Sequence, residues 1–363
     1  MKILIVQDYL RSGGTERQSV LLANAFASAG HATTLVTFRP NGPLGSTVNA
    51  AVNRHVLQPF DLGLDWLAPG FFRYAKQQQP DAIVCMGRMA NCYAGGLQKH
   101  LPRTAVVATM RTGKKLPRLF RRSLLRVRHV VANSREARDT LTRHHGVPAG
   151  KISVIHNSLV FTTEIKETAR ADLRTRFGAS PQTAVLLCVA MFRPEKNQRE
   201  LIEIVAGLPA TTDWQLWLAG DGPARAACEQ LVAGKNLGAR VKFPGFHRDP
   251  SGLYRAADIA VHASWSESLS NFLIEAQASG LPAVACEAQG IAECFVANRT
   301  GWVVPRGDHA AFRDALTRLI AMDEHERTAL AHEAQRYARS TFDPATQVAA
   351  YLDLLHTLTA SSS

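Results

Sequence analysis

KILIVQDYLRSGGTERQSVLLANAFASAGHATTLVTF, residues 2–38, contains the pattern that decides the fold. Lys2–Gln7 is a short apolar run, Glu16–Gly30 has helical periodicity, and Thr33–Phe38 is a second β-rich run. Gly13 and Gly14 break the chain before the helix. A strand, a turn, a helix and a second strand in this order predict the βαβ unit of a parallel sheet.

The same alternation continues along the chain and restarts after Asn157. In the first half we expect further strands at Ala82–Cys85, Ala105–Thr109, His129–Ala132 and Ile152–Ile155, and a helix at Arg135–His144. In the second half we expect strands at Val185–Ala190, Gln215–Leu218, Arg240–Phe243, Ile259–His262 and Ala283–Cys286, and helices at Gln198–Gly207, Ala224–Gly234, Asn271–Gly280 and Ala310–Met322. The pattern predicts an α/β protein of two Rossmann-like, doubly wound lobes that face each other across a cleft.

The length of 363 residues also favours two domains, because single cores rarely grow beyond about 250–300 residues. We expect an N-terminal lobe at 1–162, a C-terminal lobe at 163–343, and a last helical stretch at 344–363 that packs on the N-terminal lobe or elsewhere. No apolar run is long enough to span a membrane, and the apolar start is too short for a secretory signal. Six cysteines without a Cys-x-x-Cys pair argue against a disulfide framework or a zinc site, so we expect a cytoplasmic protein.

Three strand ends carry residues suited to an anionic ligand, and ligands of open α/β sheets bind at such ends. After the first strand, Gly13 and Gly14 precede a helix and can form a phosphate cradle, although they can equally be a plain turn. After the strand at Val185–Ala190, Arg193 and Lys196 stand at a helix start, where they can bind a diphosphate or form a solvated surface pair.

The third strand end, Glu267-Ser268-Leu269-Ser270-Asn271-Phe272-Leu273-Ile274-Glu275, is the most informative. Ser270 is a typical helix N-cap, and Gly280 is a typical stop signal. The helix therefore begins between the two glutamates, and its first N–H groups can bind an anion. One carboxylate can accept bonds from sugar hydroxyls and the other from a ribose diol.

In this order the motifs resemble the retaining glycosyltransferases of family 4, which have the GT-B fold. The resemblance covers nearly the whole chain, and its motifs are Gly13-Gly14-Thr15-Glu16-Arg17, Asn133-Ser134, Val154-Ile155-His156-Asn157-Ser158, Pro194-Glu195-Lys196-Asn197, Gly220-Asp221-Gly222-Pro223, Tyr254-Arg255-Ala256-Ala257-Asp258 and the glutamate pair. It implies a catalytic group of Glu267, Arg193 and Lys196, with Lys196 on the diphosphate and Glu267 on the donor sugar. It also implies donor-binding residues, namely Gly13, Gly14, Phe246 near the base, Leu269, Ser270, Asn271, Phe272, Leu273, and Glu275 on the ribose. It implies no metal and no cofactor.

Two positions depart from the family pattern. Met191 stands where an arginine is usual, and Arg193 is the nearest substitute. The chain reads Met110-Arg111-Thr112 where a histidine is frequent near the sugar O6, so that role is not transferred. We expect His156 and His262 to be buried or to lie behind the residues that contact ligand.

A basic stretch lies in the N-terminal lobe. The whole chain has a formal net charge of +12, which favours an anionic partner. Arg111–Arg128 contains no acid and interleaves cations with apolar residues, the pattern of a helix that lies on a surface. We expect contact with an anionic or lipid-linked saccharide acceptor, or peripheral contact with the inner membrane, through Arg111, Lys114, Lys115, Arg118, Arg121 and Arg122. A core helix with a solvated cationic face is the alternative, and nucleic acid is disfavoured because aromatic residues are scarce in the stretch.

These observations favour a hexosyltransferase that moves a sugar from a nucleotide-sugar donor to a saccharide or lipid-linked acceptor in bacterial surface polysaccharide or lipopolysaccharide synthesis. One alternative is a nucleotide-sugar epimerase on the same fold, which would need acid and base groups aimed at the sugar. Another is a non-catalytic protein that binds a sugar nucleotide or an anionic surface. Met191 and Arg111 favour that alternative, and the presence of Lys196, Glu267 and Glu275 argues against it.

Overall fold

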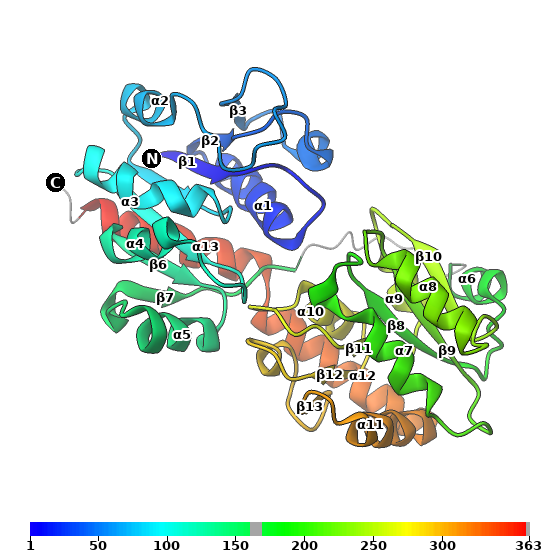
Figure 1. Ribbon diagram of the computed structural model, residues 1–363. Helices are drawn as coiled ribbons and strands as arrows, with labels where there is room; N and C mark the ends of the chain where they lie inside the picture. Colours follow the sequence, from blue (N-terminus) through cyan, green and yellow to red (C-terminus); the bar gives the residue numbers. More distant parts are fainter. Residues whose placement is uncertain (160–168, 361–363) are drawn as a thin grey trace. The chain divides into compact units, whose positions relative to one another are not determined.

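The computed structural model describes residues 1–159 and 169–360 and divides into two compact units. Unit 1 consists of Met1–Val160 and Asp343–Ser363, and unit 2 of Phe161–Phe342 (Figure 1). The boundary expected between residues 162 and 163 lies outside the described residues. Each unit is an α/β domain with a parallel sheet between helices, as the alternating sequence pattern predicts.

The sheet of unit 1 has seven parallel strands in the order β3-β2-β1-β4-β5-β6-β7. In its centre Ile3 of β1 lies opposite Thr33 of β2 and Ala82 of β4. Ile3, Leu4, Ile5 and Val6 are all fully buried, because helices cover both faces. The strands are β1 Lys2–Gln7, β2 Ala32–Thr37, β3 Asn53–Val56, β4 Ala82–Cys85, β5 Ala105–Met110, β6 His129–Ala132 and β7 Ile152–Val154.

The C-terminal helix α13, Pro344–Ala360, belongs to unit 1. Its buried Tyr351 and Leu355 share one core cluster with Ile3 and with Phe26 of α1, and the Phe26 and Tyr351 rings meet edge to face at 6.5 Å. Apolar burial therefore attaches the end of the chain to the face of the sheet that α1 covers. The helices of unit 1 are α1 Gly14–Ser28, η1 Pro43–Thr47, α2 Phe71–Gln78, α3 Ala90–His100, α4 Arg118–Arg126, α5 Arg135–His145, η2 Ala149–Lys151 and α13.

The sheet of unit 2 has six parallel strands in the order β10-β9-β8-β11-β12-β13. Chain order reverses beside β8, which pairs with β9 on one side and with β11 on the other. Its strands are β8 Ala184–Val189, β9 Trp214–Ala219, β10 Val241–Gly245, β11 Ile259–His262, β12 Ala283–Cys286 and β13 Gly301–Val304. Its helices are α6 Ala169–Phe177, η3 Pro194–Lys196, α7 Gln198–Ala206, α8 Arg225–Gly234, α9 Ser251–Ala256, α10 Asn271–Ala278, η4 Ala292–Cys294, α11 His309–Ala321 and α12 Glu324–Thr341.

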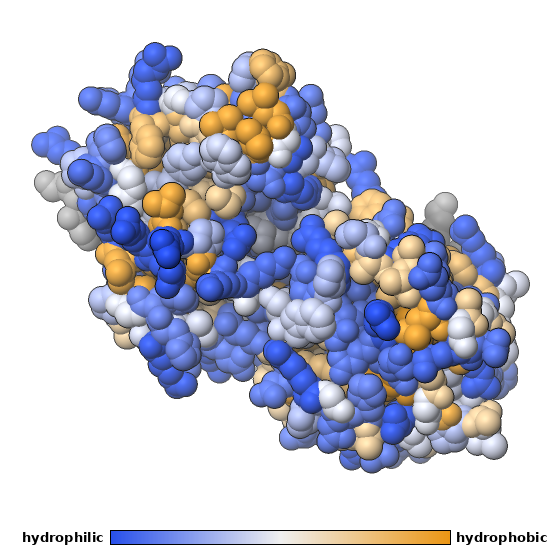
Figure 2. Space-filling model, in the orientation of Figure 1, coloured by the Kyte–Doolittle hydropathy of each residue, from blue (hydrophilic) through white to orange (hydrophobic). Residues whose placement is uncertain are grey.

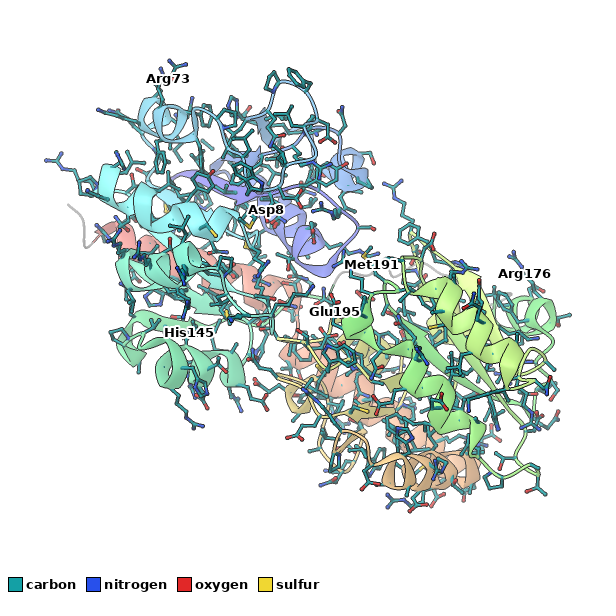
Figure 3. The ribbon with its side chains drawn as sticks, viewed as in Figure 1. Asp8, Arg73, His145, Arg176, Met191 and Glu195 are labelled. Carbon is teal, nitrogen blue, oxygen red and sulfur yellow. The ribbon has the colours of Figure 1, made fainter. Side chains whose placement is uncertain are left out.

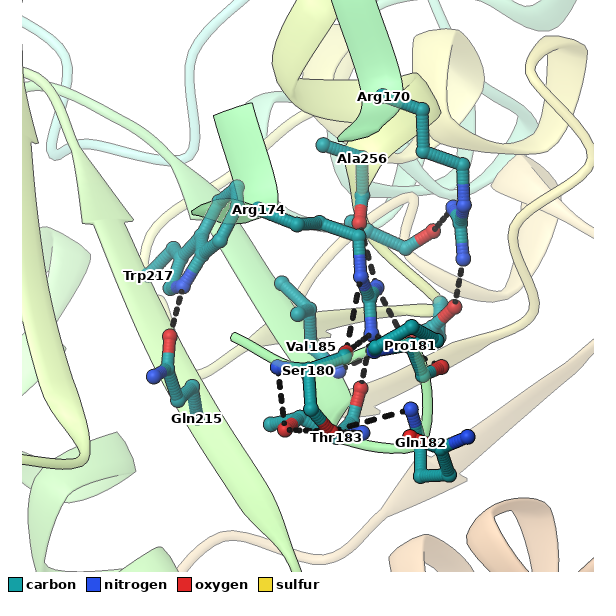
Figure 4. A network of polar contacts seen from close by, with 12 residues as sticks. Arg170, Arg174, Ser180, Pro181, Gln182, Thr183, Val185, Gln215, Trp217 and Ala256 are labelled. Atoms are coloured by element: carbon teal, nitrogen blue, oxygen red, sulfur yellow. Dashed lines mark hydrogen bonds and ion pairs between the residues drawn. The ribbon is translucent and has the colours of Figure 1, made fainter. Parts of the chain in front are cut away.

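A buried arginine of α6 fixes the entry to this sheet (Figure 4). Arg174 is 4% exposed and donates to the carbonyl oxygens of Ser180 at 2.7 Å, of Ala256 at 2.9 Å and of Thr183, and to Asp258 Oδ2 at 3.1 Å. Its charge is thus paired and hydrogen-bonded, as a buried charge requires. Arg174 is therefore a structural clamp between α6, β8 and α9.

Candidate functional site

Two neighbouring strands of unit 2 place the predicted catalytic residues together. The loop after β8 carries Lys196, and the loop after β11 carries Glu267. Because chain order reverses between β8 and β11, their carboxyl ends form the topological switch point at which open α/β sheets bind ligands. Lys196 Nζ lies 2.5 Å from Glu267 Oε1, although 71 residues separate the two in sequence.

Glu267 is a buried carboxylate that two partners keep ionised. Its Oε1 accepts from Lys196 and from His262 Nε2, which lies 3.0 Å away at the end of β11. Burial raises the pKa of Glu267, but the Lys196 charge and the His262 hydrogen bond outweigh it, so that the net pKa is lowered to about 2. His262 is 3% exposed, and its Nδ1 atom has no partner among the described residues.

The η3 turn and the Glu267 loop are joined by hydrogen bonds to a backbone carbonyl oxygen. The carbonyl oxygen of Glu195 accepts from Ser264 Oγ at 2.9 Å and from Trp265 N at 3.1 Å. Arg306 donates to the carbonyl oxygens of Trp265 at 3.0 Å and Glu287 at 2.7 Å. These bonds hold together the loops that follow β8, β11 and β12. They therefore fix the positions of the loops that carry Lys196 and Glu267.

Three glycines allow backbones to approach closely around this surface. Gly220 and Gly222 have positive φ, and an added Cβ would lie 2.0 Å from Ala190 O and 2.4 Å from Phe192 O respectively. Gly290 has φ +73°, and its added Cβ would lie 2.0 Å from Ser268 O. No side chain fits at these points, which explains the Gly-Asp-Gly motif at residues 220–222.

Helix α10 begins where the sequence predicts, and its capping serine is present. Ser270 Oγ accepts from Leu273 N at 3.4 Å. Leu269, Phe272 and Leu273 are buried, and Asn271 is half-buried. Residues 269–273 thus lie in the first turn of α10 or directly before it, where the helix dipole favours an anion.

Glu275 is also buried, at 6% exposure, and Tyr254 of α9 holds it. Tyr254 Oη donates to Glu275 Oε2 at 2.6 Å, and the Tyr254 ring stacks on Phe272 at 6.0 Å. Nothing in the spacing of the two glutamates indicated this tyrosine, although it stands in a motif that carries the family resemblance.

The remaining predicted residues of unit 2 are more exposed. Arg193 is half-buried at the start of η3, and its side chain has no partner in the part of the chain that the structure describes. Met191 and Glu195 lie in the same loop (Figure 3). Phe246, expected to meet a base, directly follows β10 and is 54% exposed.

Gly13 and Gly14 lie in unit 1, where Gly13 caps α1. An added Cβ at Gly13 would lie 2.5 Å from Glu16 Oε2, so the glycine lets a carboxylate lie against the N-terminus of α1. Asp8 directly follows β1, at the switch point between β1 and β4 of this sheet (Figure 3). Its oxygens accept from Met89 N at 2.9 Å and Ala90 N at 2.6 Å, and burial raises the pKa of Asp8 to about 6. Asp8 is not among the site residues that the sequence predicts, and its two bonds cap the N-terminus of α3.

Only the second half of the basic stretch forms an amphipathic helix, α4, and Arg111, which precedes it, points elsewhere. In α4, Phe120, Ser123 and Leu124 are buried. The other predicted cations are exposed, namely Lys114, Lys115, Arg118, Arg121 and Arg122. Arg111 instead donates to Asn157 Oδ1 and, at 2.7 Å, to Tyr351 Oη of α13. Its Nε is buried without a partner among the described residues, so Arg111 is not part of the exposed basic face.

Across the described residues, no group of three or more His, Cys, Asp or Glu side chains could hold a metal ion. None of the helices described is long and apolar enough to cross a membrane.

Both halves of the chain match models of known glycosyltransferase families. Residues 12–159 match the family model described as Glycosyltransferase Family 4, and residues 183–322 match the model described as Glycosyl transferases group 1. The chain belongs to glycosyltransferase family 4. The first match contains Gly13, Gly14 and the basic stretch of this family 4 chain, and the second contains Lys196, Glu267 and Glu275.

Curated relatives resemble part of this family 4 protein. The lipopolysaccharide core biosynthesis glycosyltransferase LpsE of Rhizobium meliloti is 30% identical over 182 residues, 50% of this chain and 52% of LpsE. The D-inositol 3-phosphate glycosyltransferase of Rhodococcus jostii is 31% identical over 58% of this chain and 48% of that protein. The matched regions therefore span about half the length of these relatives.

Solved structures establish the fold. HepE of Anabaena, in complex with UDP-glucose, matches with a TM-score of 0.84 at 23% identity, over 98% of this chain and 100% of that chain. WaaG, a glycosyltransferase involved in lipopolysaccharide biosynthesis, matches with a TM-score of 0.76 at 18% identity, over 97% of this chain and 99% of that one. The two Rossmann-like units of this family 4 protein therefore have the GT-B fold that the sequence predicts.

Proposed function

We propose that this protein is a retaining, metal-independent glycosyltransferase. It transfers a hexose from a nucleotide-sugar donor to a saccharide or lipid-linked acceptor. The observation that carries the proposal is the pair of buried carboxylates at the switch point of unit 2, Glu267 bound to Lys196 and Glu275 bound to Tyr254. A buried ionised carboxylate with a fixed partner is suited to accept hydroxyl hydrogen bonds from a sugar or a ribose.

The residues divide the work of glycosyl transfer. Lys196, Arg193 and the first amides of α10 neutralise the diphosphate as the bond between it and the sugar C1 breaks. Glu267, kept ionised by Lys196 and His262, orients the donor sugar, and Glu275 orients the ribose. An acceptor hydroxyl attacks C1 from the face that the diphosphate leaves and passes its proton to a phosphate oxygen. No metal is needed, because these groups already supply positive charge.

The donor and acceptor classes follow from the relatives. HepE binds UDP and UDP-glucose, so a UDP-hexose is the first donor to test. LpsE and WaaG act in lipopolysaccharide synthesis, which supports a lipopolysaccharide-type or other surface polysaccharide acceptor. We assign that acceptor to unit 1, whose α4 and preceding loop expose five of the predicted cations, and we propose peripheral contact of this basic face with the cytoplasmic side of the inner membrane.

The test is turnover of UDP-, GDP- and ADP-hexoses with and without a lipopolysaccharide core acceptor. Lys196→Ala should abolish acceptor-dependent turnover, whereas Lys235→Ala, which breaks a surface ion pair with Glu203, should leave it intact. Conversion of the donor without any acceptor would instead support the epimerase. Tight donor binding without turnover of any kind would support the non-catalytic alternative, for which Met191 at the usual arginine position is the specific observation.

A further inference from the structure

The loop between β3 and α2 in unit 1 exposes its large apolar side chains. Phe60 is 64% exposed, Leu62 41%, Leu64 36% and Trp66 54%. They are four of the nine large apolar side chains that are exposed among the described residues, and Leu119 and Leu125 of α4 are two more. Figure 2 shows apolar surface over the β3–α2 region, with further apolar surface near α4 on the same face.

This loop is firmly built, and its polar groups are directed to the protein. Asp61 and Asp65 alternate with the exposed residues, and both accept from Arg39 at 2.7 Å. Arg11 binds Asp65 at 2.7 Å as well. Gln58, which is fully buried, donates to the carbonyl oxygens of Leu64 at 2.8 Å and Leu67 at 2.7 Å. In this loop the polar groups bind the protein and the apolar side chains face solvent. A cluster of exposed apolar side chains is typical of a contact surface.

One turn of α3 joins the loop to the basic helix α4. Tyr93 Oη donates to Trp66 O at 2.7 Å. In the same turn, Gly95 N donates to Ser123 Oγ of α4 at 3.0 Å, and Ser123 Oγ donates to Cys92 O at 3.1 Å. The apolar loop and the basic helix therefore both contact one segment of α3.

The segment of sequence that follows this loop carries the excess positive charge of the protein. Residues 67–128 contain 13 lysines and arginines and a single acid, Asp81. The rest of the chain contains 29 cations and 29 acids, so the whole excess of +12 lies in this segment. Cations beside exposed aromatic and leucine side chains match an anionic bilayer, which offers phosphate charge at its surface and hydrocarbon below it.

We propose that residues 58–67 are an insertion loop that places Phe60, Leu62, Leu64 and Trp66 among the lipids of an anionic bilayer while α4 supplies the electrostatic attraction. The proposal rests on the peripheral membrane contact suggested above and assigns its apolar part to a different element. Insertion is insensitive to salt, because it depends on apolar burial. Attraction by α4 is screened within about 8–10 Å at physiological salt.

The experiment compares two triple variants of the full chain in vesicle co-sedimentation. The loop variant is Phe60→Ser, Leu62→Ser, Leu64→Ser, and the helix variant is Arg118→Ser, Arg121→Ser, Arg122→Ser. Val303→Ser is the matched control, because it removes a 37% exposed apolar side chain from unit 2. Vesicles are phosphatidylcholine with and without phosphatidylglycerol, at low and high salt.

The loop variant should lose roughly ten- to a hundredfold in vesicle affinity, by a similar factor at both salt concentrations. The helix variant should lose about a hundredfold on anionic vesicles at low salt, and much less at high salt. Trp66 emission should shift to the blue when vesicles are added to wild type, and the shift should disappear in Trp66→Phe.

Two results would overturn the proposal. If the loop variant sediments like wild type while the helix variant does not, the loop does not insert, and the proposed contact through α4 stands. If the loop variant loses turnover on a soluble acceptor without vesicles, the loop is an acceptor site. Glycosyl transfer itself is tested separately by the Lys196→Ala assay, so failure of the loop and failure of the enzyme assignment are distinguishable.

Discussion

Replacement of Lys196 by Met removes the cation that holds Glu267 ionised, and the consequence can be worked out from the structure. The pKa of Glu267 is about 2, against an ordinary value of 4.5. A difference of this size corresponds to about 3 kcal/mol of stability at neutral pH. Lys196 and His262 share it, and the Lys196 side chain is 26% exposed, so solvent screens part of its effect. We expect Lys196→Met to lower the free energy of unfolding by about 2–3 kcal/mol at pH 7.

The pH dependence has a definite sign. Because the pKa of Glu267 is lower in the folded state than in the unfolded state, its contribution is complete above about pH 4.5 and is lost as the pH falls through about 2. In Lys196→Met, the Lys196 charge no longer offsets the effect of burial, so the pKa of Glu267 is higher than in wild type. The stability difference between the two proteins should therefore be largest near neutral pH, and it should shrink as the pH falls from the Glu267 pKa of the variant toward the wild-type value of about 2.

Urea unfolding followed by circular dichroism measures this difference across the pH range. Lys235→Met is the matched control, because Lys235 pairs with Glu203 at 2.8 Å on the surface, where an ion pair contributes no more than about 1 kcal/mol. Equal stability of Lys196→Met and wild type at pH 7, with the same pH profile, would refute the conclusion that Lys196 holds the Glu267 charge.

Other perturbations test the rest of the site. Glu275→Ala should weaken nucleotide binding by roughly 10- to 150-fold, and Tyr254→Phe should weaken it less, because only the 2.6 Å bond that positions the carboxylate is lost; unchanged calorimetric affinity would remove Glu275 from the ribose role. Gly290→Ala should reduce thermal stability and donor affinity, because its Cβ would lie 2.0 Å from Ser268 O. Gly307→Ala is the control: Gly307 also has positive φ, but no atom lies within 4 Å of the added Cβ, so this variant measures the effect of backbone strain without the collision. Turnover should persist in EDTA, and its loss with recovery on addition of Mg²⁺ or Mn²⁺ would contradict metal independence.

The structure supports the order of the predicted elements and shows where local pattern was too weak. Strands β1, β4, β6, β11 and β12 have the predicted bounds, because buried parallel strands are continuous apolar runs. The edge strand β3, Asn53–Val56, was missed because its residues are exposed or half-buried and show no apolar alternation. Helix α12 was also missed, although Asp323 and Glu326 form a capping box that announces it.

The site shows a similar division. The sequence selected Lys196, Glu267 and Glu275 because loops at strand ends and a serine cap can be recognised locally. It could not show that His262 is hydrogen-bonded to Glu267 or that Tyr254 donates to Glu275. Nothing in the sequence indicates which polar side chain, 5 or 21 residues away, will be the partner. It also grouped Arg111 with the surface cations, whereas the structure turns its guanidinium toward Asn157 and Tyr351.

By itself, then, the sequence determined what depends on neighbours along the chain: which segments are strands or helices, where α10 begins, and which residue types stand at the strand ends. The tertiary structure alone decided what depends on contacts across the fold. It placed α13 on unit 1 through Tyr351 and Leu355, and it exposed the apolar side chains of residues 60–66 because Arg39 and Gln58 bind the rest of that loop. Local periodicity reports which side chains can be buried together, but the packing of distant segments decides which of them are.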